Sequence, residues 1–367
     1  MLQPDREVAS DHRSPRVTTV RPFWHHDGAP VKGRDTVPRI AHLFIVLLSL
    51  SGLAACAPTA LDLYRDDQVR QGKAPSGTPT VAACDLVPIA RLPIEMRGRL
   101  LTVPISINDQ TLRMVVDSGA ERTTISENAA GRLKLPRDMQ RIQTSRGVGG
   151  DVTSADAVVS SFVLGNVRLP PLERVAVGRF GFDADANPLA DGLLGADVLL
   201  AFDLDIDVPG KTLTIYRVRR CPNSEPPWQE PFVAVQGVTA RKDRLLIPFQ
   251  LDGVSGTAIL DTGASATTIG VQMAKRLGLN EQTMALDRKV VQRGAGTGSI
   301  TAHYHWFKEL RVGPAIVRGL MLTVLPTDAG VGDALIGQDF LQGRRVWLSF
   351  PTRQVFVSKL EHELPPR

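Results

Sequence analysis

The chain has 367 residues, a formal net charge of +5, 43% hydrophobic residues and 22% charged residues. That length accommodates about two domains, and the composition is ordinary for a globular protein, which excludes a disordered or fibrous chain. Lys and Arg do not gather into a basic stripe, so we expect no nucleic-acid partner. Because 32 Gly and 26 Pro accompany few aromatic residues, we expect many turns and short strands rather than long helices.

The N-terminal segment has the pattern of an export signal. Arg34 and Arg39 precede an apolar stretch from about Leu43, and small residues follow in LAAC (53–56). These are the parts of a signal peptide, and the apolar stretch is shorter than the roughly 20 residues of a transmembrane helix. The small residues before Cys56 resemble the lipobox of bacterial lipoproteins, in which the cysteine is acylated and becomes the N-terminus. The alternative is an ordinary signal peptide with an incidental cysteine.

The lipobox resemblance implies a cell-envelope protein that is anchored to the membrane through Cys56 and faces the periplasm, with inner or outer membrane left open. An exported chain lies in oxidising surroundings, where cysteines pair. The remaining cysteines, Cys84 and Cys221, flank the first of two repeats described below. We expect a disulfide between them, with two buried free thiols as the alternative. No Cys or His spacing typical of a zinc site is present, so we expect no metal and no cofactor.

Two blocks of the sequence, from about residue 89 to 219 and from about residue 245 to 360, repeat the same parts in the same order. Each begins with a predicted hairpin, in which a polar turn (108–110 or 252–256) joins an alternating strand to a strand rich in Val, Ile and Leu. Short helical patterns, a glycine cluster, further strands and the matching segments DGLLGADVL and DALIGQDFL follow. The agreement of so many parts predicts an internal duplication.

A Pro-rich polar stretch, CPNSEPPWQEPF (221–232), separates the two blocks and is typical of a linker. Because the duplication removes the need to dimerise, we expect a monomer. The predicted organisation is an N-terminal extension with a lipoprotein signal peptide (1–55), a tether (56–83), a first lobe (84–220), a linker (221–243) and a second lobe (244–367).

An aspartate ends the second strand of each predicted hairpin. The first block reads RMVVDSGAE (113–121) and the second reads TAILDTGAS (257–265), so Asp117 and Asp261 leave apolar strands and enter tight glycine turns. A buried carboxylate is costly there unless its charge is shared or hydrogen-bonded. A two-fold arrangement would bring the two carboxylates together, and two like charges at close range hold one proton between them. One carboxylate can then take a proton from water while the other donates to a carbonyl, which is general acid–base hydrolysis.

The segments Asp117-Ser118-Gly119-Ala120 and Asp261-Thr262-Gly263-Ala264, each with Thr-Thr-Ile shortly after, resemble the active-site loops of aspartic proteases, and more closely those of the retropepsin-like proteases of bacteria. LLG (193–195) and LIG (335–337) are similar to the segment that lies under the catalytic loop in that family. The resemblance spans both blocks. It implies an all-β fold with two retropepsin-like β-barrel lobes related by a pseudo-two-fold axis, with short helices after each active-site loop.

The resemblance also implies residue roles. Asp117 and Asp261 match the catalytic aspartates, and Ser118 and Thr262 match hydroxyl residues that brace the two loops against each other. The activity implied is that of an aspartic endopeptidase with a polypeptide substrate.

Glycines at two places match further features of the family. Gly119 and Gly263 match glycines whose N–H groups bind the carboxylates and whose missing Cβ permits the tight turn. The glycine-rich segments GVGG and GAGTG match flaps that close over substrate, with Gly149 and Gly296 as expected substrate contacts.

The two motifs differ four residues after each aspartate, where Glu121 stands in the first and Ser265 in the second. Viral relatives carry an acidic residue there that binds the substrate backbone, so the resemblance implies a substrate contact at Glu121, a different one at Ser265, and an asymmetric cleft. Arg122 follows Glu121, and an ion pair between these two neighbours is the alternative.

Other polar residues have simpler interpretations. Asp197 and Asp339 recur in the matching segments, and we expect them to cap short helices. His303 and His305 lie two apart on a predicted strand without an obvious third ligand, so we expect surface histidines rather than a metal site. The alternating aspartates of FDLDID are expected on the solvent face of a strand: Asp203, Asp205 and Asp207.

These observations predict an exported aspartic endopeptidase that hydrolyses extended polypeptides with a water activated by Asp117 and Asp261. One alternative is a non-catalytic envelope lipoprotein that kept the protease fold and binds peptide or peptidoglycan, because a fold does not guarantee an activity. The other is a lipoprotein that serves as a scaffold for partners.

Overall fold

The computed structural model describes residues 86–169, 174–182, 188–217, 225–239, 244–296 and 298–358. All of them belong to one compact unit. The predictions for the extension and signal peptide (1–55), the tether (56–83) and the three cysteines lie outside the described residues.

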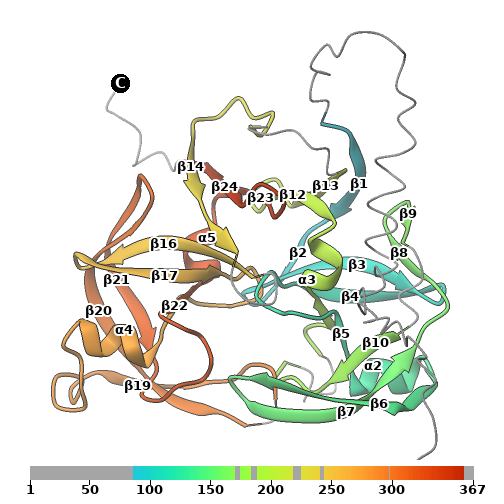
Figure 1. The fold of residues 1–367 in the computed structure, drawn as a ribbon, viewed down its shortest axis with the longest axis horizontal. Helices are drawn as coiled ribbons and strands as arrows, with labels where there is room; N and C mark the ends of the chain where they lie inside the picture. Colours follow the sequence, from blue (N-terminus) through green and yellow to red (C-terminus); the bar gives the residue numbers. More distant parts are fainter. Residues whose placement is uncertain are drawn as a thin grey trace, which may run out of the picture. The chain divides into compact units, whose positions relative to one another are not determined.

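Each half of the chain forms its own β lobe (Figure 1). The first half contains β1 (Pro88–Pro93), β2 (Glu95–Arg97), β3 (Leu100–Ile107), β4 (Gln110–Val116), β5 (Thr124–Ser126), α2 (Glu127–Arg132), β6 (Arg137–Gly147), β7 (Gly150–Val158), β8 (Phe162–Leu164), β9 (Val167–Arg168), β10 (Arg174–Gly178), β11 (Gly192–Leu194), α3 (Ala196–Leu199), β12 (Phe202–Asp207) and β13 (Thr212–Arg217). The second half contains β14 (Phe232–Gln236), β15 (Val238–Thr239), β16 (Leu245–Leu251), β17 (Val254–Leu260), β18 (Thr268–Ile269), α4 (Val271–Arg276), β19 (Arg288–Gln292), β20 (Ile300–Val312), β21 (Ala315–Val324), β22 (Ala334–Ile336), α5 (Gln338–Leu341), β23 (Arg345–Ser349) and β24 (Gln354–Ser358).

The hairpin that opens each lobe has a tight two-residue turn. Asn108 and Asp109 have φ values of 49° and 62°, and Asp252 and Gly253 have φ values of 47° and 84°. Positive φ at both central positions is the requirement of the turn that suits a twisted hairpin, and Asn, Asp and Gly tolerate it. The second turn is shorter than the predicted 252–256, because β17 already begins at Val254.

Strand pairing repeats between the lobes and confirms the predicted pseudo-two-fold fold. In the first lobe, β11 pairs parallel with β4 and antiparallel with β5; in the second, β22 pairs parallel with β17 and antiparallel with β18. Strands β10 and β21 pair parallel with β5 and β18 in the same way. The predicted short helices after each active-site loop are present as α2 and α4.

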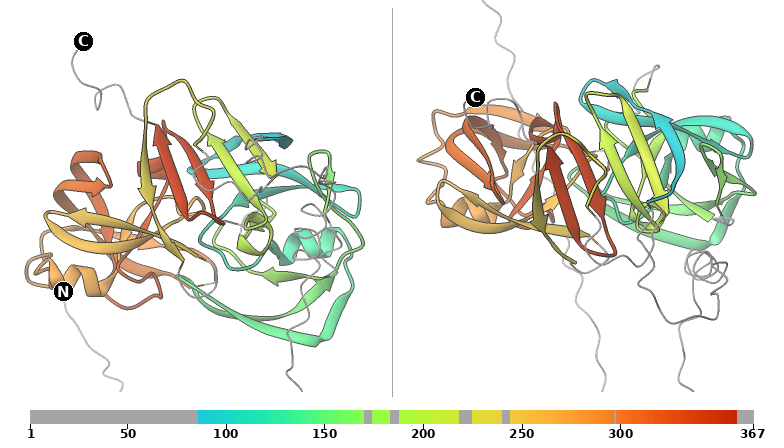
Figure 2. Two further views of the ribbon diagram at one scale, coloured as in Figure 1. Left: turned by 45° about the horizontal axis from the view of Figure 1, so that its top comes forward. Right: turned by 90° about the horizontal axis from the view of Figure 1, so that it is seen from above.

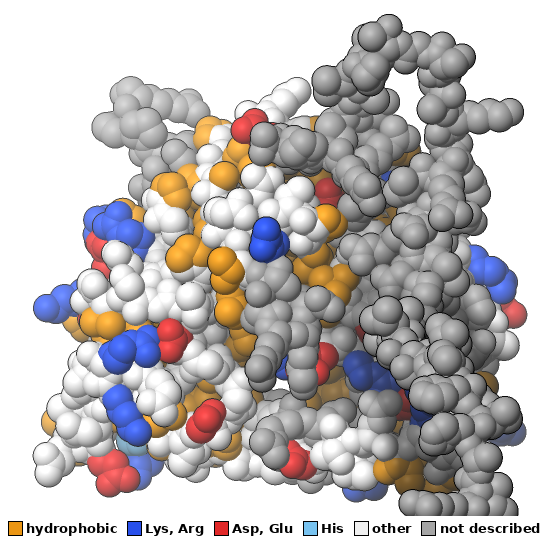
Figure 3. Space-filling view, in the orientation of Figure 1, with side chains coloured by type: hydrophobic (Ala, Val, Ile, Leu, Met, Phe, Trp, Pro, Cys, Tyr) orange, Lys and Arg blue, Asp and Glu red, His pale blue; other side chains and the backbone are white. Residues whose placement is uncertain are grey.

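The core follows from strand alternation. Along β3, Leu101, Val103, Ile105 and Ile107 are all buried, and β16 buries every second residue in the same way. Period-two burial is what a pleated strand imposes, and each buried aliphatic side chain stabilises the fold by about 1.5–3 kcal/mol. On the face drawn in Figure 3, hydrophobic side chains show only in small areas between scattered Lys, Arg, Asp and Glu side chains.

A six-stranded sheet joins the lobes, in the order β1-β13-β12-β23-β24-β14. Each lobe contributes three strands, and β12 and β23 meet antiparallel at the centre. Figure 2 shows the red strands of the second lobe beside the yellow-green strands of the first. Because β14 lies within the predicted linker 221–243, the polar connection between the lobes is shorter than the sequence suggests.

The prediction that the aspartates of β12 face solvent is wrong for Asp203 and Asp205, which are only 5% and 2% exposed. Segment 225–231 covers this face of the sheet, and Trp228 Nε1 donates to Asp205 Oδ1 at 3.2 Å. Arg345 of the second lobe binds both oxygens of Asp205, at 2.8 and 2.7 Å, and its guanidinium lies 5.0 Å from the Trp228 ring centroid. The ion pair therefore ties the two lobes together. Asp207 is half-buried and accepts from Gly210 N–H.

Burial raises the pKa of Asp203 to about 6, and its cross-strand neighbour Ser349 offsets only part of this. Oδ1 of Asp203 has no hydrogen-bond partner among the described residues. The native state therefore binds this proton more tightly than the unfolded chain does. Stability is fully present below pH 4, falls as the pH rises from about 4 to 6, and stays reduced above pH 6.

We expect Asp203→Asn to raise the free energy of unfolding at pH 8 by roughly 3 kcal/mol, the value of about two pKa units, and to change it little at pH 4. Urea unfolding of wild type and variant at both pH values measures this. A variant that is equally destabilised at pH 4 and pH 8 would show that the carboxylate has a structural partner.

Candidate active site

The two candidate catalytic loops begin where apolar strands end. β4 and β17 end one residue before Asp117 and Asp261. Asp117 N–H donates to Leu194 O at 3.0 Å, and Asp261 N–H donates to Ile336 O at 2.9 Å. The LLG and LIG segments therefore lie beside the loops as β11 and β22, and they hold the start of each loop in line with its strand.

Backbone N–H groups of each loop bind one oxygen of the aspartate in that loop. The residues two and three positions after Asp117 donate to its Oδ1 at 3.0 and 2.8 Å. The residues two and three positions after Asp261 donate to its Oδ1 at 2.9 and 3.0 Å. Both carboxylates are thus held in matching orientations.

The glycines of the two loops let the carboxylates meet. A Cβ on Gly119 would lie 2.5 Å from Asp261 Cγ, and a Cβ on Gly263 would lie 2.4 Å from Asp117 Cγ. Non-bonded carbon atoms pack at about 3.5–4.0 Å, so no side chain fits at either position. Each carboxylate lies against the glycine of the opposite loop, and the structure brings together the residues that the two motifs predict.

The surroundings of the two carboxyl groups change the pKa of each. Burial raises the pKa of Asp117 well above its ordinary value, and the negative charge of Asp261 raises it further. Burial also raises the pKa of Asp261, but hydrogen bonds from Gly263 and Asp117 and the charge of Arg244 oppose the increase. The pKa of both carboxyl groups is therefore raised, as expected of two buried acidic groups that are close enough to share a proton.

Two hydroxyl groups brace the loops across the axis. Ser118 N–H donates to Thr262 Oγ1 and Thr262 N–H donates to Ser118 Oγ, both at 3.0 Å. Each hydroxyl then donates across to the strand of the opposite lobe, Ser118 to Leu260 O at 2.6 Å and Thr262 to Val116 O at 2.7 Å. The N–H and hydroxyl groups of Ser118 and Thr262 are all buried. The hydrogen bonds that fix the separation of the two aspartates are therefore shielded from water.

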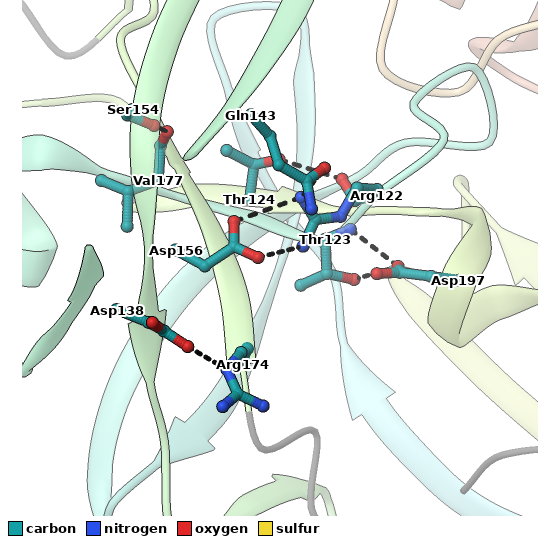
Figure 4. Close-up of polar contacts among 10 residues, drawn as sticks. All are labelled: Arg122, Thr123, Thr124, Asp138, Gln143, Ser154, Asp156, Arg174, Val177 and Asp197. Carbon is teal, nitrogen blue, oxygen red and sulfur yellow. Dashed lines mark hydrogen bonds and ion pairs between the residues drawn. The ribbon is translucent and has the colours of Figure 1, made fainter. Parts of the chain in front are cut away.

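The predicted helix-capping role of Asp197 and Asp339 is wrong. The residues that cap α3 and α5 are glycines, without a side-chain cap bond. Asp197 instead accepts from both N–H and Oγ1 of Thr123 at 2.7 Å (Figure 4), and Asp339 accepts from Thr267 N–H and Oγ1 at 2.8 and 2.6 Å. These aspartates hold the far end of each catalytic loop.

The alternative pairing of Glu121 with Arg122 does not form. Arg122 binds Asp156 of the first flap through both terminal nitrogens, at 3.2 and 2.9 Å (Figure 4). Glu121 Oε1 accepts from Arg244 Nη2 of the other lobe at 3.0 Å. Ser265, the counterpart of Glu121, is exposed, so the two sides of the cleft differ here.

Arg244 is the residue that sequence comparison missed. The last pair before each hairpin turn is Ile107 with Gln110 in the first lobe and Leu251 with Val254 in the second, so Ile107 and Leu251 are equivalent. Seven residues before them stand Leu100 in the first lobe and Arg244 in the second. An alignment that instead superposes the Leu-Leu pairs of the two sequences makes Arg99 the counterpart of Arg244, and Arg99 is exposed. A comparison that starts at the turns shows that Arg244, whose charge acts on Asp261, takes the place of the apolar Leu100 of the first lobe.

Both glycine clusters lie at hairpin tips that contact each other. The β6–β7 hairpin and the β19–β20 hairpin lie along the bottom of Figure 1. Gly149 N–H donates to Ala295 O and Gly298 N–H donates to Gly149 O, both at 2.8 Å. A Cβ on Gly296 would lie 2.4 Å from the Gly149 carbonyl carbon, so Gly149 and Gly296 serve the close contact of the two tips.

The two histidines of β20 are half-buried rather than on the surface. His305 Nδ1 lies 2.6 Å from Asp287 Oδ2, and its ring packs edge-on against Phe307 with centroids 5.0 Å apart. Within the described residues, no group of three or more His, Cys, Asp or Glu side chains is arranged to hold a metal ion. Among the described helices, none is long and apolar enough to cross a membrane.

We expect Thr262→Val to lower the free energy of unfolding by about 1–3 kcal/mol for each buried group that it leaves without a partner. Thr262→Ser is the matched control, because the first lobe has serine at this position and the hydroxyl is kept. Urea unfolding measures both. Equal destabilisation by the two variants would show that the lost methyl group, not the hydroxyl brace, matters.

Two family models match the chain. Residues 103–198 match an aspartyl protease family, and residues 247–343 match the gag-polyprotein putative aspartyl protease family. Among solved structures, the crystal structure of the aspartic proteinase from Irpex lacteus matches with 11% identity and a TM-score of 0.47, covering 74% of this chain and 97% of that chain. No relative was found among curated protein sequences. On the family matches, the chain carries two aspartyl protease-like domains in tandem, each with one of the paired aspartates.

Proposed function

We propose that this protein is an aspartic endopeptidase that cleaves peptide bonds of extended polypeptides. The observation that supports this proposal is the pair of buried carboxyl groups, each of which lies against the glycine of the opposite loop and has a raised pKa. Ionised Asp261 is the base that takes a proton from the attacking water. Protonated Asp117 donates to the carbonyl oxygen of the substrate as the tetrahedral species forms. The water oxygen bonds to the carbonyl carbon. Asp261 then passes the proton it took from water to the leaving nitrogen, the C–N bond breaks, and a hydroxyl of the tetrahedral species returns a proton to Asp117, which leaves an amine and a carboxylic acid.

The proposed reaction also requires that bulk water be kept away from the two aspartates, and the flaps would do this. Their tips are bonded to each other above the cleft, so a bound chain would lie between the flap backbone and the two aspartates. Substrate entry then requires those tip bonds to open. A non-catalytic peptide-binding protein would need the cleft and the flaps, but it would not need a shared proton.

We expect Asp117→Asn and Asp261→Asn each to lower kcat/KM by a factor of about 10²–10⁴ or more, the range for loss of a general acid or base. The assay is a peptide library, digested from acidic to neutral pH with and without pepstatin. Wild-type activity should fall at high pH, where Asp117 loses its proton, and at low pH, where Asp261 gains one. Thermal melts show whether the variants are folded. A wild type that cleaves nothing, or variants that cleave as well as it does, would favour the binding-protein alternative.

Arg244 is expected to set the acid side of this pH profile. Arg244→Met removes the cation that lowers the pKa of Asp261, so the acid limb of kcat/KM against pH should move to higher pH. Arg244→Lys keeps the charge and should move it less. If both variants change KM alone and leave the acid limb in place, Arg244 does not control the pKa of Asp261, and its role is to hold Glu121.

A further inference from the structure

The first flap is joined to its catalytic loop through one arginine. Arg122 lies in that loop, directly before Thr123. Its guanidinium binds both oxygens of Asp156 in β7, at 3.2 and 2.9 Å, and donates to Gln143 Oε1 in β6 at 2.7 Å (Figure 4). Because the strand order is β6-β7-β10-β5 and β5 begins at Thr124, the arginine spans β10 and connects the catalytic loop to both strands of the flap.

This ion pair is largely shielded from water on the flap side. The Asp156 side chain is only 3% exposed, and that of Arg122 is 32% exposed. A buried carboxylate is costly without a partner, and a guanidinium that binds both of its oxygens fixes direction as well as distance. The pair therefore holds β7 in one position relative to the loop that carries Asp117.

Two more polar contacts bind the same flap to β10. Arg174 Nε of β10 donates to Asp138 Oδ2 of β6 at 2.5 Å, and Ser154 Oγ of β7 donates to Val177 O of β10 (Figure 4). The base of the first flap is thus attached to its lobe by charged and polar side chains.

Strand pairing identifies the corresponding positions of the second lobe. Thr124 and Thr268, each the second threonine of a Thr-Thr-Ile segment, pair with Ala176 and Thr323. From these pairs, the register of β7 on β10 and of β20 on β21 gives the next equivalences, and the register within each flap extends them to β6 and β19. The resulting counterparts, first lobe before second, are Arg122 and Ala266, Gln143 and Val290, Ser154 and Ala302, Asp156 and Tyr304, Asp138 and Arg288, and Arg174 and Met321.

The second lobe has different chemistry at these positions. Ala266 offers no cation and Tyr304 offers no carboxylate, and Val290 packs in an apolar cluster. Gln292 Nε2 donates to Thr323 Oγ1 at 3.2 Å, which is a neutral bond to β21 rather than to the catalytic loop. At the matching positions, the second flap therefore has no counterpart of the ion pair that binds the first flap to its catalytic loop.

The flap tips themselves do not show this difference. Val148 of the first tip packs against Leu325 and Val331 of the second lobe, and Ala295 of the second tip packs against Phe180 of the first lobe. The asymmetry therefore lies at the base of the flaps, where each hairpin adjoins its own lobe.

We propose that Arg122 is a positioning residue, which fixes the first flap relative to the catalytic loop of Asp117, and that the second flap lacks such a link. The inference rests on the proposed peptidase function for its effect on substrate. When one flap is held in place before binding, less ordering is required as an extended peptide binds beside it. The effect of Arg122 on the flap itself does not depend on catalysis.

The test measures amide hydrogen exchange of the full chain by mass spectrometry, which reports local opening and needs no activity. Arg122→Met removes the charge and keeps a long side chain. Amides of β6 and β7 should exchange at least about tenfold faster, because loss of one partner from a buried ion pair is costly, while those of β19 and β20 should change less than about twofold. Arg122→Lys keeps the charge without the two-pronged donor and should give a smaller increase.

Arg122→Met also leaves the Asp156 carboxylate buried without its partner, so a second variant removes both charges. Arg122→Ala with Asp156→Tyr gives the first lobe the residues that the second lobe carries at these positions. It should speed exchange of the first flap as Arg122→Met does, with a smaller loss of melting temperature. Arg99→Met, which removes an exposed arginine of the same lobe, is the control and should leave exchange unchanged.

Peptide cleavage tests the effect on substrate. In Arg122→Met and in the double variant, KM should rise about tenfold while kcat falls less than about threefold, because the flap acts through binding. Unchanged exchange of the first flap, or equal acceleration in all strands including β12 and β23, would overturn the inference, and so would an unchanged KM. If wild type cleaves no peptide at any pH, the proposed function fails, but the exchange data still decide whether Arg122 holds the flap.

Discussion

The close approach of two carboxylates is the constraint on which the rest of this structure depends. Two acidic groups at this distance repel each other once both are ionised, and each would relax away if its loop could move. The fold prevents this with three sets of hydrogen bonds: N–H groups that bind one oxygen of each carboxylate, buried hydroxyls that cross the axis, and the aspartates Asp197 and Asp339 that bind the far end of each loop. Even the glycines act by what they lack, because a single methyl group would separate the pair.

The two lobes are similar but not identical around this pair. The pairings of the strands that lead into the catalytic loops repeat, although the sheet of the first lobe has ten strands and that of the second has eight. Near the aspartates, individual side chains differ as well. Arg244 takes the place that Leu100 has in the first lobe, and Ser265 takes the place of Glu121. The same scaffold therefore presents unlike charge to the two carboxylates, which a pair of identical subunits cannot do.

The sequence predicted the local parts of this arrangement well. Hairpins, catalytic loops, flaps and short helices all depend on patterns a few residues long, and the duplication gave each pattern twice. What failed were predictions about faces and partners. Alternation in FDLDID shows correctly that Asp203 and Asp205 share a face, but it cannot show that segment 225–231 and Arg345 cover that face.

Partners at long range were missed for the same reason. Arg122 is adjacent to Glu121 in the sequence, yet its partner is Asp156 on the flap, while Glu121 reaches across to the other lobe. Arg244 was hidden by a one-residue offset, because the Leu-Leu pair in both strands suggests a register that the turns do not support. Geometry at the turn, rather than residue similarity, sets which residues are equivalent.

The six-stranded sheet has a consequence for how such a chain could arise. With three strands from each lobe, either half alone would end in an open edge, β12 or β23, with unpaired backbone groups. A second copy of the same half could pair at that edge around a true two-fold axis and rebuild the sheet with identical subunits. Symmetry would require such a dimer to place the same residues on both sides of its cleft. Joining the halves in one chain removes that requirement, and the placement of Arg244 and the exchange of Glu121 for Ser265 are differences that only a fused pair can keep.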